Sequence, residues 1–272
     1  MIIAQISDLH VQPAGQQAYG IVDTNRLLAA AIAQLNRLQP QPELVVASGD
    51  LVDERTEAEY EMLKALLAPL RAPLYLAMGN HDNRAAFRKV FPDLPYVPPT
   101  GFVRYVLEDY PVRIIVLDTL VDGAGYGDMD AEQLVWLQAQ LAAQPHKPTL
   151  IFMHHPPFAT GLLGMDQSRC RGNAALADLI AQYPNVQRVA CGHLHRSIQT
   201  MWAGTVGSVA PSVAHQVALK LSEAQPPALV MEPPAFHLHL WDDATGLVTH
   251  TAFIGEFTAY SCQTGAEIAL YA

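Results

Sequence analysis

Short apolar runs alternate with amphipathic segments over the first 195 residues of the chain. The runs are apolar almost throughout, which is typical of strands that are buried on both faces. They cover residues 2–7, 43–48, 74–78, 102–108, 112–118, 149–153 and 186–190. Between them, apolar residues recur at helical spacing, and the N-capping residues Asp23, Thr56 and Asp130 precede three of these segments. This alternation predicts a layered α/β core.

The pattern changes after residue 197. Two segments, 235–241 and 247–254, flank the turn sequence Asp-Asp-Ala-Thr-Gly and predict a β-hairpin. With a shorter apolar segment at 228–231, they indicate that the last part of the chain is mostly β. We expect these closing strands to form part of a second sheet that packs on the first.

Composition and charge exclude several classes of protein. The chain has 272 residues, 50% of them hydrophobic, which suits one large domain or one domain with a small appendage. The formal net charge of −10 argues against a surface that binds nucleic acid polymers by counterion release. Three cysteines without paired spacing suit a reducing compartment, and we find no secretory signal and no apolar run of about 18 residues. We therefore expect a cytoplasmic protein without a membrane partner.

Polar side chains follow five of the predicted strands at the point where each strand ends. The sequences there are Ser-Asp-Leu-His, Ser-Gly-Asp, Gly-Asn-His-Asp, His-His-Pro-Pro and Gly-His-Leu-His. Because ligands of open α/β sheets collect at the carboxyl ends of the strands, we expect these side chains to converge. The candidate residues are Asp8, His10, Asp50, Asn80, His81, His154, His155, His193 and His195.

The residue types favour a pair of transition-metal ions. Imidazole nitrogens with carboxylates and one amide oxygen suit Zn, Mn, Fe or Co, whereas an all-oxygen set would indicate Mg or Ca. Seven ligands are too many for one tetrahedral ion and suit two ions that share a carboxylate. Taken singly, Asp50 is explained as a helix N-cap, Asn80 as a turn residue and His154 as a core histidine. The five strand ends taken together favour the metal site.

In this order, the five motifs resemble those of the binuclear, calcineurin-like metallophosphoesterase superfamily. The sequences Phe-Met-His-His-Pro-Pro and Cys-Gly-His-Leu-His and the early Asp-x-His resemble its class III cyclic nucleotide phosphodiesterases and bacterial glycerophosphodiesterases. The resemblance implies a four-layer α-β-β-α sandwich of two mixed sheets flanked by helices, with extra C-terminal strands. Residues 1–200 would form the metallophosphoesterase core. Residues 201–272 would complete the sheets and form a small C-terminal β cap or oligomerisation segment.

The resemblance also implies a role for each candidate. One metal ion would be held by Asp8, His10 and His195 and the other by Asn80, His154 and His193, with Asp50 bridging the two. His81 would be catalytic, as a general acid or a donor to the leaving group, and Asn80, His81 and His195 would contact the substrate. Two ions, Fe, Mn, Zn or Co, would provide a bridging hydroxide that attacks the phosphorus. The expected reaction is hydrolysis of small phosphodiesters, either glycerophosphodiesters or cyclic nucleotides.

Other functions fit parts of the pattern. A phosphomonoesterase or a nuclease would use the same metal site, although the net charge disfavours the nuclease. A non-catalytic scaffold for protein binding is a further alternative, but such a protein should have lost ligands, and all seven are present. The resemblance implies a homo-oligomer, a dimer or higher. We expect specificity to depend on the segments Asp82–Gly101 and Pro156–Gly172.

The sequence leaves the roles of some neighbouring side chains open. Asp82 either orients His81 or completes the turn, and His215 either reaches the pocket or does not. His155 points away from the ligand position before it on an extended chain, so we expect it to pack behind the site.

Two further histidines belong to the predicted C-terminal hairpin. His237 and His239 share one strand face, and without a nearby carboxylate we interpret that face as solvated rather than as a third metal site.

Overall fold

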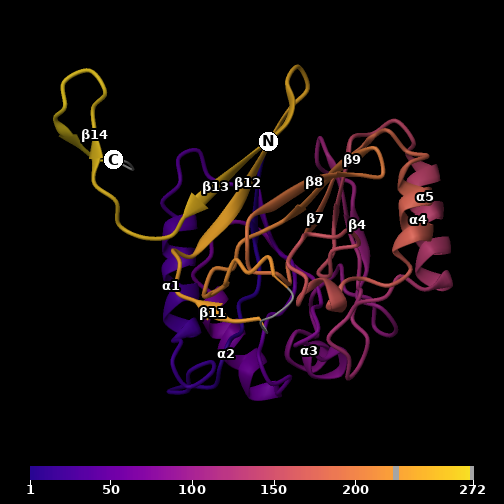
Figure 1. Ribbon diagram of the computed structural model, residues 1–272, viewed down its shortest axis with the longest axis horizontal. Helices are drawn as coiled ribbons and strands as arrows, with labels where there is room; N and C mark the ends of the chain where they lie inside the picture. Colours follow the sequence, from indigo (N-terminus) through magenta and orange to yellow (C-terminus); the bar gives the residue numbers. More distant parts are fainter. Residues whose placement is uncertain (223–226, 270–272) are drawn as a thin grey trace.

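Two mixed β-sheets pack against each other in a computed structural model that describes residues 1–222 and 227–269 (Figure 1). The first sheet has the strand order β13-β12-β1-β2-β3. Its strands are β1 (Ile2–Ile6), β2 (Leu44–Ala47), β3 (Leu74–Leu76), β12 (Ala235–Asp242) and β13 (Gly246–Phe253). Strands β1, β2 and β3 are parallel, β12 pairs antiparallel with β1, and β13 pairs antiparallel with β12.

The second sheet has the strand order β4-β5-β6-β7-β9-β8. Its strands are β4 (Tyr105–Leu107), β5 (Arg113–Val116), β6 (Thr149–Phe152), β7 (Val186–Cys191), β8 (Ile198–Trp202) and β9 (Thr205–Val209). The four inner strands are parallel, and the two edge strands, β4 and β8, are antiparallel to their neighbours. Each sheet is therefore mixed.

Helices cover the outer faces of both sheets. They are α1 (Thr24–Leu35), α2 (Glu57–Leu67), α3 (Arg84–Val90), α4 (Ala131–Ala143) and α5 (Asn173–Ile180), with a 3₁₀ turn at Asp166–Ser168. The predicted caps form, because Asp23, Thr56 and Asp130 each accept a backbone N–H in the first turn of the helix that follows. In Figure 1, α1 and α2 flank the first sheet, and α4 and α5 flank the second. The predicted α/β sandwich of two mixed sheets flanked by helices is confirmed.

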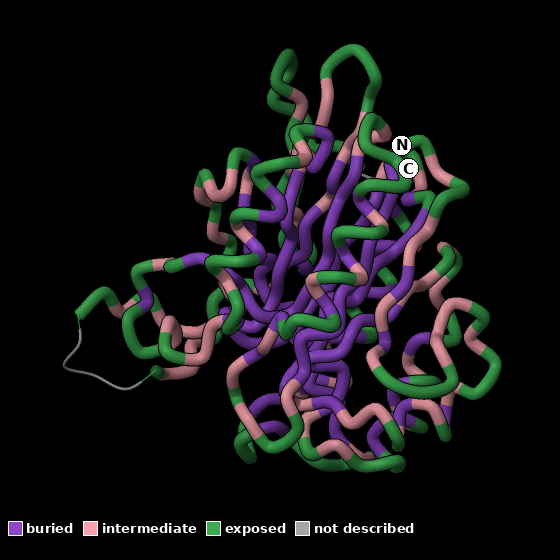
Figure 2. The backbone as a smooth tube through the Cα atoms, turned by 90° about the vertical axis from the view of Figure 1, so that its right-hand side faces the viewer, coloured by how far each residue is buried: buried purple, intermediate pink, exposed green. Residues whose placement is uncertain are grey.

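The buried residues form two apolar clusters. One joins the first sheet to α1, α2 and α3 and extends between the sheets, and the other joins the second sheet to α4 and α5. Figure 2 shows the strands as continuous buried segments at the centre of the molecule, with the exposed loops around them. This packing fixes the strand ends that carry the candidate ligands.

The C-terminal part adds two small hairpins to the sandwich. One consists of β10 (Gln216–Val217) and β11 (Leu229–Val230), and the other of β14 (Ala259–Tyr260) and β15 (Glu267–Ile268). Residues 255–269, which we call the C-terminal arm, project away from the body of the protein (Figure 1). Within the described ranges, no helix has the length and apolar character that crossing a bilayer requires.

The prediction of a solvated face at His237 and His239 is wrong, because both side chains are fully buried. Strand β12 lies inside the first sheet, between β1 and β13, and the face that carries these histidines is covered by the second sheet. His239, for example, lies with its ring centroid 5.9 Å from that of Phe152 in β6. The alternating pattern in β12 therefore indicates a face that packs against the opposite sheet, not a face exposed to water.

Candidate metal centre

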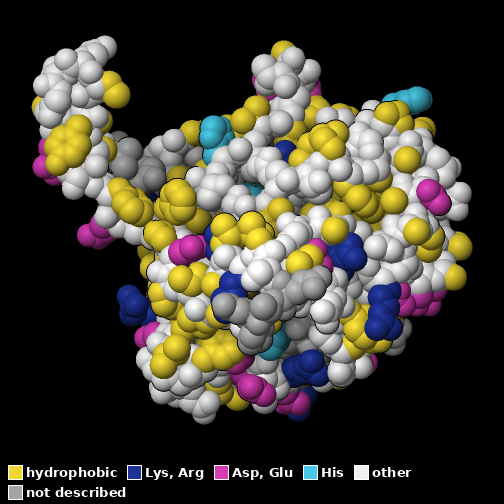
Figure 3. Space-filling model, in the orientation of Figure 1, with side chains coloured by type: hydrophobic (Ala, Val, Ile, Leu, Met, Phe, Trp, Pro, Cys, Tyr) yellow, Lys and Arg dark blue, Asp and Glu magenta, His cyan; other side chains and the backbone are white. Residues whose placement is uncertain are grey.

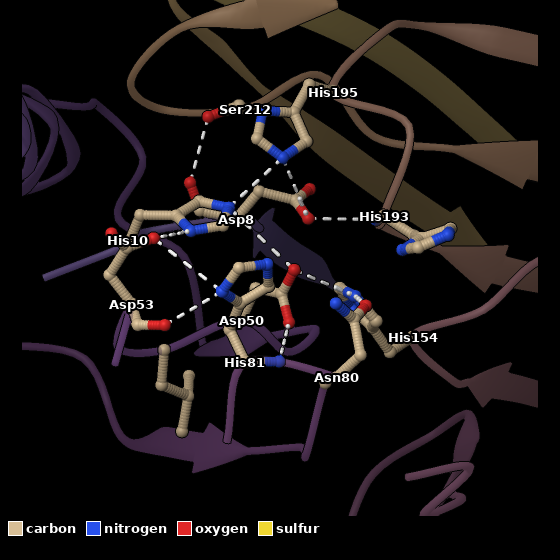
Figure 4. A network of polar contacts seen from close by, with 12 residues as sticks. Asp8, His10, Asp50, Asp53, Asn80, His81, His154, His193, His195 and Ser212 are labelled. Atoms are coloured by element: carbon tan, nitrogen blue, oxygen red, sulfur yellow. Dashed lines mark hydrogen bonds and ion pairs between the residues drawn. The ribbon is translucent and has the colours of Figure 1, made fainter. Parts of the chain in front are cut away.

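The seven predicted ligands come together at the carboxyl ends of strands from both sheets (Figure 4). Asp8 and His10 follow β1, Asp50 follows β2, Asn80 follows β3, His154 follows β6, and His193 and His195 follow β7. All seven are buried, with Asn80 the most exposed at 8%. The strand ends of both sheets lie at the same side of the sandwich. They therefore bring together side chains as far apart in the sequence as residues 8 and 195.

Five of these residues have a left-handed backbone, with φ between 45° and 73°. They are Asp8, His10, Asp50, His193 and His195. Non-glycine residues adopt this conformation at an energetic cost, and it persists where the surrounding structure enforces it, most often at functional sites. The conformation turns each side chain sharply out of its strand end, so that it points into the centre.

The glycines of the motifs allow the strand ends to approach one another. A Cβ atom on Gly79 would lie 2.3 Å from the backbone nitrogen and Oδ1 of Asp50, and one on Gly192 would lie 2.0 Å from Oγ of Ser7. The first contact is with the backbone, which cannot give way, and neither position leaves room for a side chain. The residue before Asn80 must therefore be a glycine, because its backbone contacts the loop that carries Asp50.

Three of the predicted histidine ligands are held by hydrogen bonds through Nδ1. His10 Nδ1 lies 2.8 Å from Oδ1 of Asp53, His154 Nδ1 lies 2.9 Å from the carbonyl oxygen of Ser48, and His195 Nδ1 lies 2.9 Å from that of His215. These acceptors favour the proton on Nδ1 of each ring and leave the Nε2 lone pair directed at the centre. Such outer partners orient and strengthen histidine ligands in metal sites.

The arrangement of atoms fits cations. Nε2 of His10 and Nε2 of His195 face each other at 3.2 Å, a distance at which two lone pairs repel unless a proton or a cation lies between them. Oδ2 of Asp8 is buried without a hydrogen-bond partner among the described residues, and burial raises the pKa of this carboxyl group. Ligand atoms of Asp8, His10, Asp50 and His195 all lie within 4.8 Å of one another. A cation at this point would satisfy all of these atoms at once.

Asp50 lies between the two predicted ligand sets. Its Oδ2 is 3.7 Å from Nε2 of His10 and 3.2 Å from Nε2 of His154. Burial alone would raise the pKa of Asp50, but the charges of His154, His81 and His10 hold it well below its ordinary value. Against the opposing effect of burial, Asp50 in turn raises the pKa of His154 to about 9. Asp50 and His154 therefore stabilise each other's charged forms.

His81 is held by a residue that the sequence did not reveal. Nδ1 of His81 lies 2.8 Å from the backbone carbonyl oxygen of Asp53, and the side chain lines the hollow over the ligands. Asp82 does not orient His81, because its carboxylate accepts hydrogen bonds from the backbone of Gly79 and Leu51 and from the Tyr60 hydroxyl. Asp82 therefore completes the turn, and Asp53 takes the orienting role.

The hollow above the ligands has a volume of about 320 Å³. His215 lines it, which answers the open question about this residue, and Tyr19 packs edge-on against the His215 ring with centroids 5.3 Å apart. Met165 and Ser168 reach the hollow from the predicted specificity segment Pro156–Gly172. The other predicted segment, Asp82–Gly101, does not contribute to this lining.

Two further contacts hold the second-sheet ligands. Oγ of Ser168 lies 2.8 Å from Nε2 of His193, a contact that the irregular sequence around Ser168 did not indicate. His155 packs behind the site as predicted, with its ring 4.8 Å from that of His154 and 4.7 Å from that of His193, and Nδ1 2.7 Å from Oγ1 of Thr119.

Comparison with known proteins identifies the class to which this fold and site belong. The family model described as Calcineurin-like phosphoesterase matches residues 1–197, so the chain belongs to the calcineurin-like phosphoesterase family. It is 40% identical over 258 residues to the "Probable glycerophosphodiester phosphodiesterase GpdQ" of Arcobacter nitrofigilis, an alignment that covers 94% of each chain. It is 30% identical over 214 residues to the 3',5'-cyclic adenosine monophosphate phosphodiesterase CpdA of Escherichia coli K12, covering 79% of this chain and 76% of CpdA.

A solved structure shares the fold at low sequence identity. The dimetal phosphatase from Danio rerio superposes with a TM-score of 0.63 at 15% identity, covering 94% of this chain and 99% of that protein. This similarity supports the architecture of two sheets and outer helices described above.

Proposed function

We propose that the protein is a metal-dependent phosphodiesterase that hydrolyses small phosphodiesters, either glycerophosphodiesters or cyclic nucleotides. The position of Asp50 between the two ligand sets carries this proposal, because a shared carboxylate is what two adjacent ions require. The names of the two relatives above, a glycerophosphodiesterase and a cyclic AMP phosphodiesterase, support the diester class.

Each ligand set would hold one ion. The first set is Asp8, His10, Asp50 and His195, and the second is Asp50, Asn80, His154 and His193. Nitrogen and oxygen ligands of this kind suit two divalent or trivalent ions of Fe, Mn, Zn or Co. When bound, such ions polarise a phosphate group and lower the pKa of water.

The protein side chains would then position and protonate the substrate. His81 donates Nδ1–H to the Asp53 carbonyl, which leaves Nε2 free to donate a proton to the departing alkoxide when the ring is charged. Asn80 is a neutral ligand, so the centre keeps a positive charge that favours an anionic substrate. Asn80 and His195 line the same hollow as His81 and would contact the phosphate.

The size of the hollow and the net charge favour a small substrate over a polymer. A volume of about 320 Å³ suits a glycerol-sized or nucleoside-sized group beside the phosphate. The formal net charge of −10 disfavours binding to nucleic acid polymers.

The C-terminal arm supports a homo-oligomer. Phe257, Tyr260 and Ile268 on the arm are 56%, 61% and 48% exposed, and Figure 3 shows hydrophobic side chains on this projecting segment. Burial against a second copy would remove this apolar surface from water. In this proposal, residues 1–200 form the catalytic core and residues 201–272 complete the sheets and supply the contact between copies. Light scattering of the protein with and without residues 255–272 tests it, and an unchanged mass would refute it.

The cysteines favour the cytoplasm. Cys170, Cys191 and Cys262 are all free thiols, and Cys170 and Cys191 are buried, which suits a reducing compartment.

Initial rates on three substrates test the activity. The protein is stripped with a chelator, reloaded with Mn²⁺, and assayed on a glycerophosphodiester, 3',5'-cyclic AMP and a phosphate monoester. We expect no activity without metal and faster hydrolysis of one of the diesters than of the monoester. A faster rate on the monoester would refute the diesterase and leave a phosphomonoesterase on the same centre. Metal binding without turnover of any of the three would favour the non-catalytic scaffold.

A further inference from the structure

Arg188 is a buried cation without a counter-ion. It lies in β7, its residue is only 6% exposed, and Nε and Nη1 have no hydrogen-bond partner among the described residues. No carboxylate in the described ranges forms an ion pair with it. Guanidinium stays protonated in proteins, and an unpaired buried charge is costly. Nothing among the described residues therefore compensates this charge.

The side chain of Arg188 points into the core between the two sheets. Arg188 and Ala190 lie on one face of β7, opposite Val206 and Ser208 of β9, and Ala190 belongs to the core cluster that lies between the sheets. The opposite face of β7 carries Val189, which packs in the cluster toward α4 and α5. Ser208 is fully buried on the inner face, and its hydroxyl also has no partner in the part of the chain that the structure describes.

His237 faces the same region from β12 of the first sheet. Its Nε2 lies 3.1 Å from Oγ of Ser197, while its Nδ1 is buried and has no partner within residues 1–222 and 227–269. Burial, and after it the charge of Arg188, lower the pKa of His237 to about 4, which favours the neutral ring. In the tautomer in which Nε2 accepts from the Ser197 hydroxyl, Nδ1 carries the proton and is a further donor.

The adjacent histidine shows what a satisfied group looks like here. His239 has partners for both ring nitrogens, because Nδ1 lies 2.8 Å from Oγ1 of Thr249 and Nε2 lies 3.1 Å from Oε1 of Gln5. In contrast, Arg188, Ser208 and His237 each carry at least one buried atom without such a partner among the described residues.

We propose that Arg188, Ser208 and His237 bind one small monovalent anion, of the size of chloride, between the two sheets. A single guanidinium charge balances a single negative charge, and the N–H groups on Nε and Nη1 of Arg188, the Ser208 hydroxyl and the His237 Nδ1–H satisfy it by hydrogen bonding. Water would accept the same hydrogen bonds but would leave the charge unbalanced. The anion enters where β8 and β13 meet, because Ser197 and Thr251 there are exposed and their hydroxyl oxygens lie 3.3 Å apart.

Unfolding in two salts tests the proposal. The Mn²⁺-loaded protein is unfolded with urea in sodium bromide and in sodium gluconate at equal ionic strength. At bromide concentrations well above its dissociation constant, each tenfold rise in bromide should lower the unfolding equilibrium constant tenfold. The reason is that only the folded state binds the anion. Arg188→Met should lose this dependence. In gluconate it should be at least as stable as the wild type, since it replaces an unpaired buried charge with an apolar side chain of similar length.

Matched controls separate a bound anion from a general salt effect. Arg26→Met removes an arginine whose side chain is 73% exposed and should respond to bromide as the wild type does. If Arg188→Met responds in the same way, the proposal is wrong. Should Arg188→Met fail to fold, Ser208→Ala takes its place and should need a higher bromide concentration for the same stabilisation.

Crystals grown in bromide provide a second, independent readout. We expect an anomalous peak within hydrogen-bond distance of Nε of Arg188 and Oγ of Ser208. Ordered water at this point would overturn the proposal. A peak without bromide-dependent stability would indicate an adventitious ion only and would overturn it as well.

Discussion

Asp53 holds two functional histidines at once. Its Oδ1 lies 2.8 Å from Nδ1 of His10, and its backbone carbonyl oxygen lies 2.8 Å from Nδ1 of His81. The carboxylate is thus a partner of a proposed metal ligand, and the peptide group is a partner of the proposed proton donor. This division predicts that side-chain substitutions at Asp53 affect metal binding first.

Asp53→Ala should lower metal affinity about 10–100-fold, the usual effect of losing an outer partner of a histidine ligand. Asp53→Asn should lower it less, because the amide oxygen still accepts from His10 but lacks the charge that strengthens the ligand. Competition with a chromogenic chelator measures the affinity. Glu54→Ala, at the adjacent exposed position, is the control and should bind metal as the wild type does. Equal affinities for all three variants would contradict the orienting role.

Gly79→Ala should disrupt the metal centre although the change is one methyl group. The new Cβ would sit 2.3 Å from the backbone nitrogen of Asp50, so the Asp50 and Asn80 loops must separate. We expect metal content after dialysis to fall at least tenfold, with a loss of stability of about 2 kcal/mol, in the range for overpacking a core. Gly125→Ala, which meets nothing within 4 Å, is the control for stability. A fully metal-loaded Gly79→Ala protein would refute the close-approach argument.

The convergence of the candidate ligands was predictable because they follow a simple physical rule. Strands buried on both faces are visible as apolar runs, and a polar residue directly after such a run has to lie at the end of a sheet. The same reasoning could not reveal Ser168, because its contact with His193 links an irregular loop to a strand end. The signal for Asp53 was present, three residues after Asp50, but an acidic residue in a loop has many ordinary explanations.

The strand order and the polar core between the sheets could not be predicted from the sequence. Alternation at His237 and His239 shows that one face of β12 differs from the other, but not which face meets water. That depends on β12 pairing with β1, a contact between residues more than 230 positions apart. Long-range pairings of this kind are determined by the packing of the whole sandwich.

His81→Ala should reduce turnover according to the leaving group. A poor alkoxide leaving group requires a proton, so kcat on a glycerophosphodiester should fall about 10²–10⁴-fold. An aryl diester with a nitrophenolate leaving group needs little protonation and should lose far less. Metal content should stay unchanged, because His81 is not in either proposed ligand set. Equal losses on both substrates would show that His81 positions the phosphate rather than protonating the leaving group. His146→Ala, an exposed position, is the control.

Acid should destabilise the protein through the buried histidines of β12. His237 has a pKa of about 4 in the folded protein, lowered first by burial and then by Arg188, against about 6.5 when unfolded. Between these values the unfolded state binds more protons, so stability is fully present above pH 6.5 and falls as the pH falls. Burial and the charge of His237 lower the pKa of His239 well below its ordinary value. His239 therefore also makes the protein less stable as the pH falls.

Urea unfolding from pH 7 to pH 4 in gluconate measures this effect. His237 alone contributes at most about 3 kcal/mol, from 1.36 kcal/mol for each unit of pKa shift. His237→Gln keeps a polar group but does not titrate, so its stability should fall less steeply over this range than that of the wild type. Some slope should remain because His239 is still present. His250→Gln in β13, where the side chain is exposed, is the matched control and should follow the wild type. Identical slopes for His237→Gln and the wild type would mean that His237 is not neutral in the folded core.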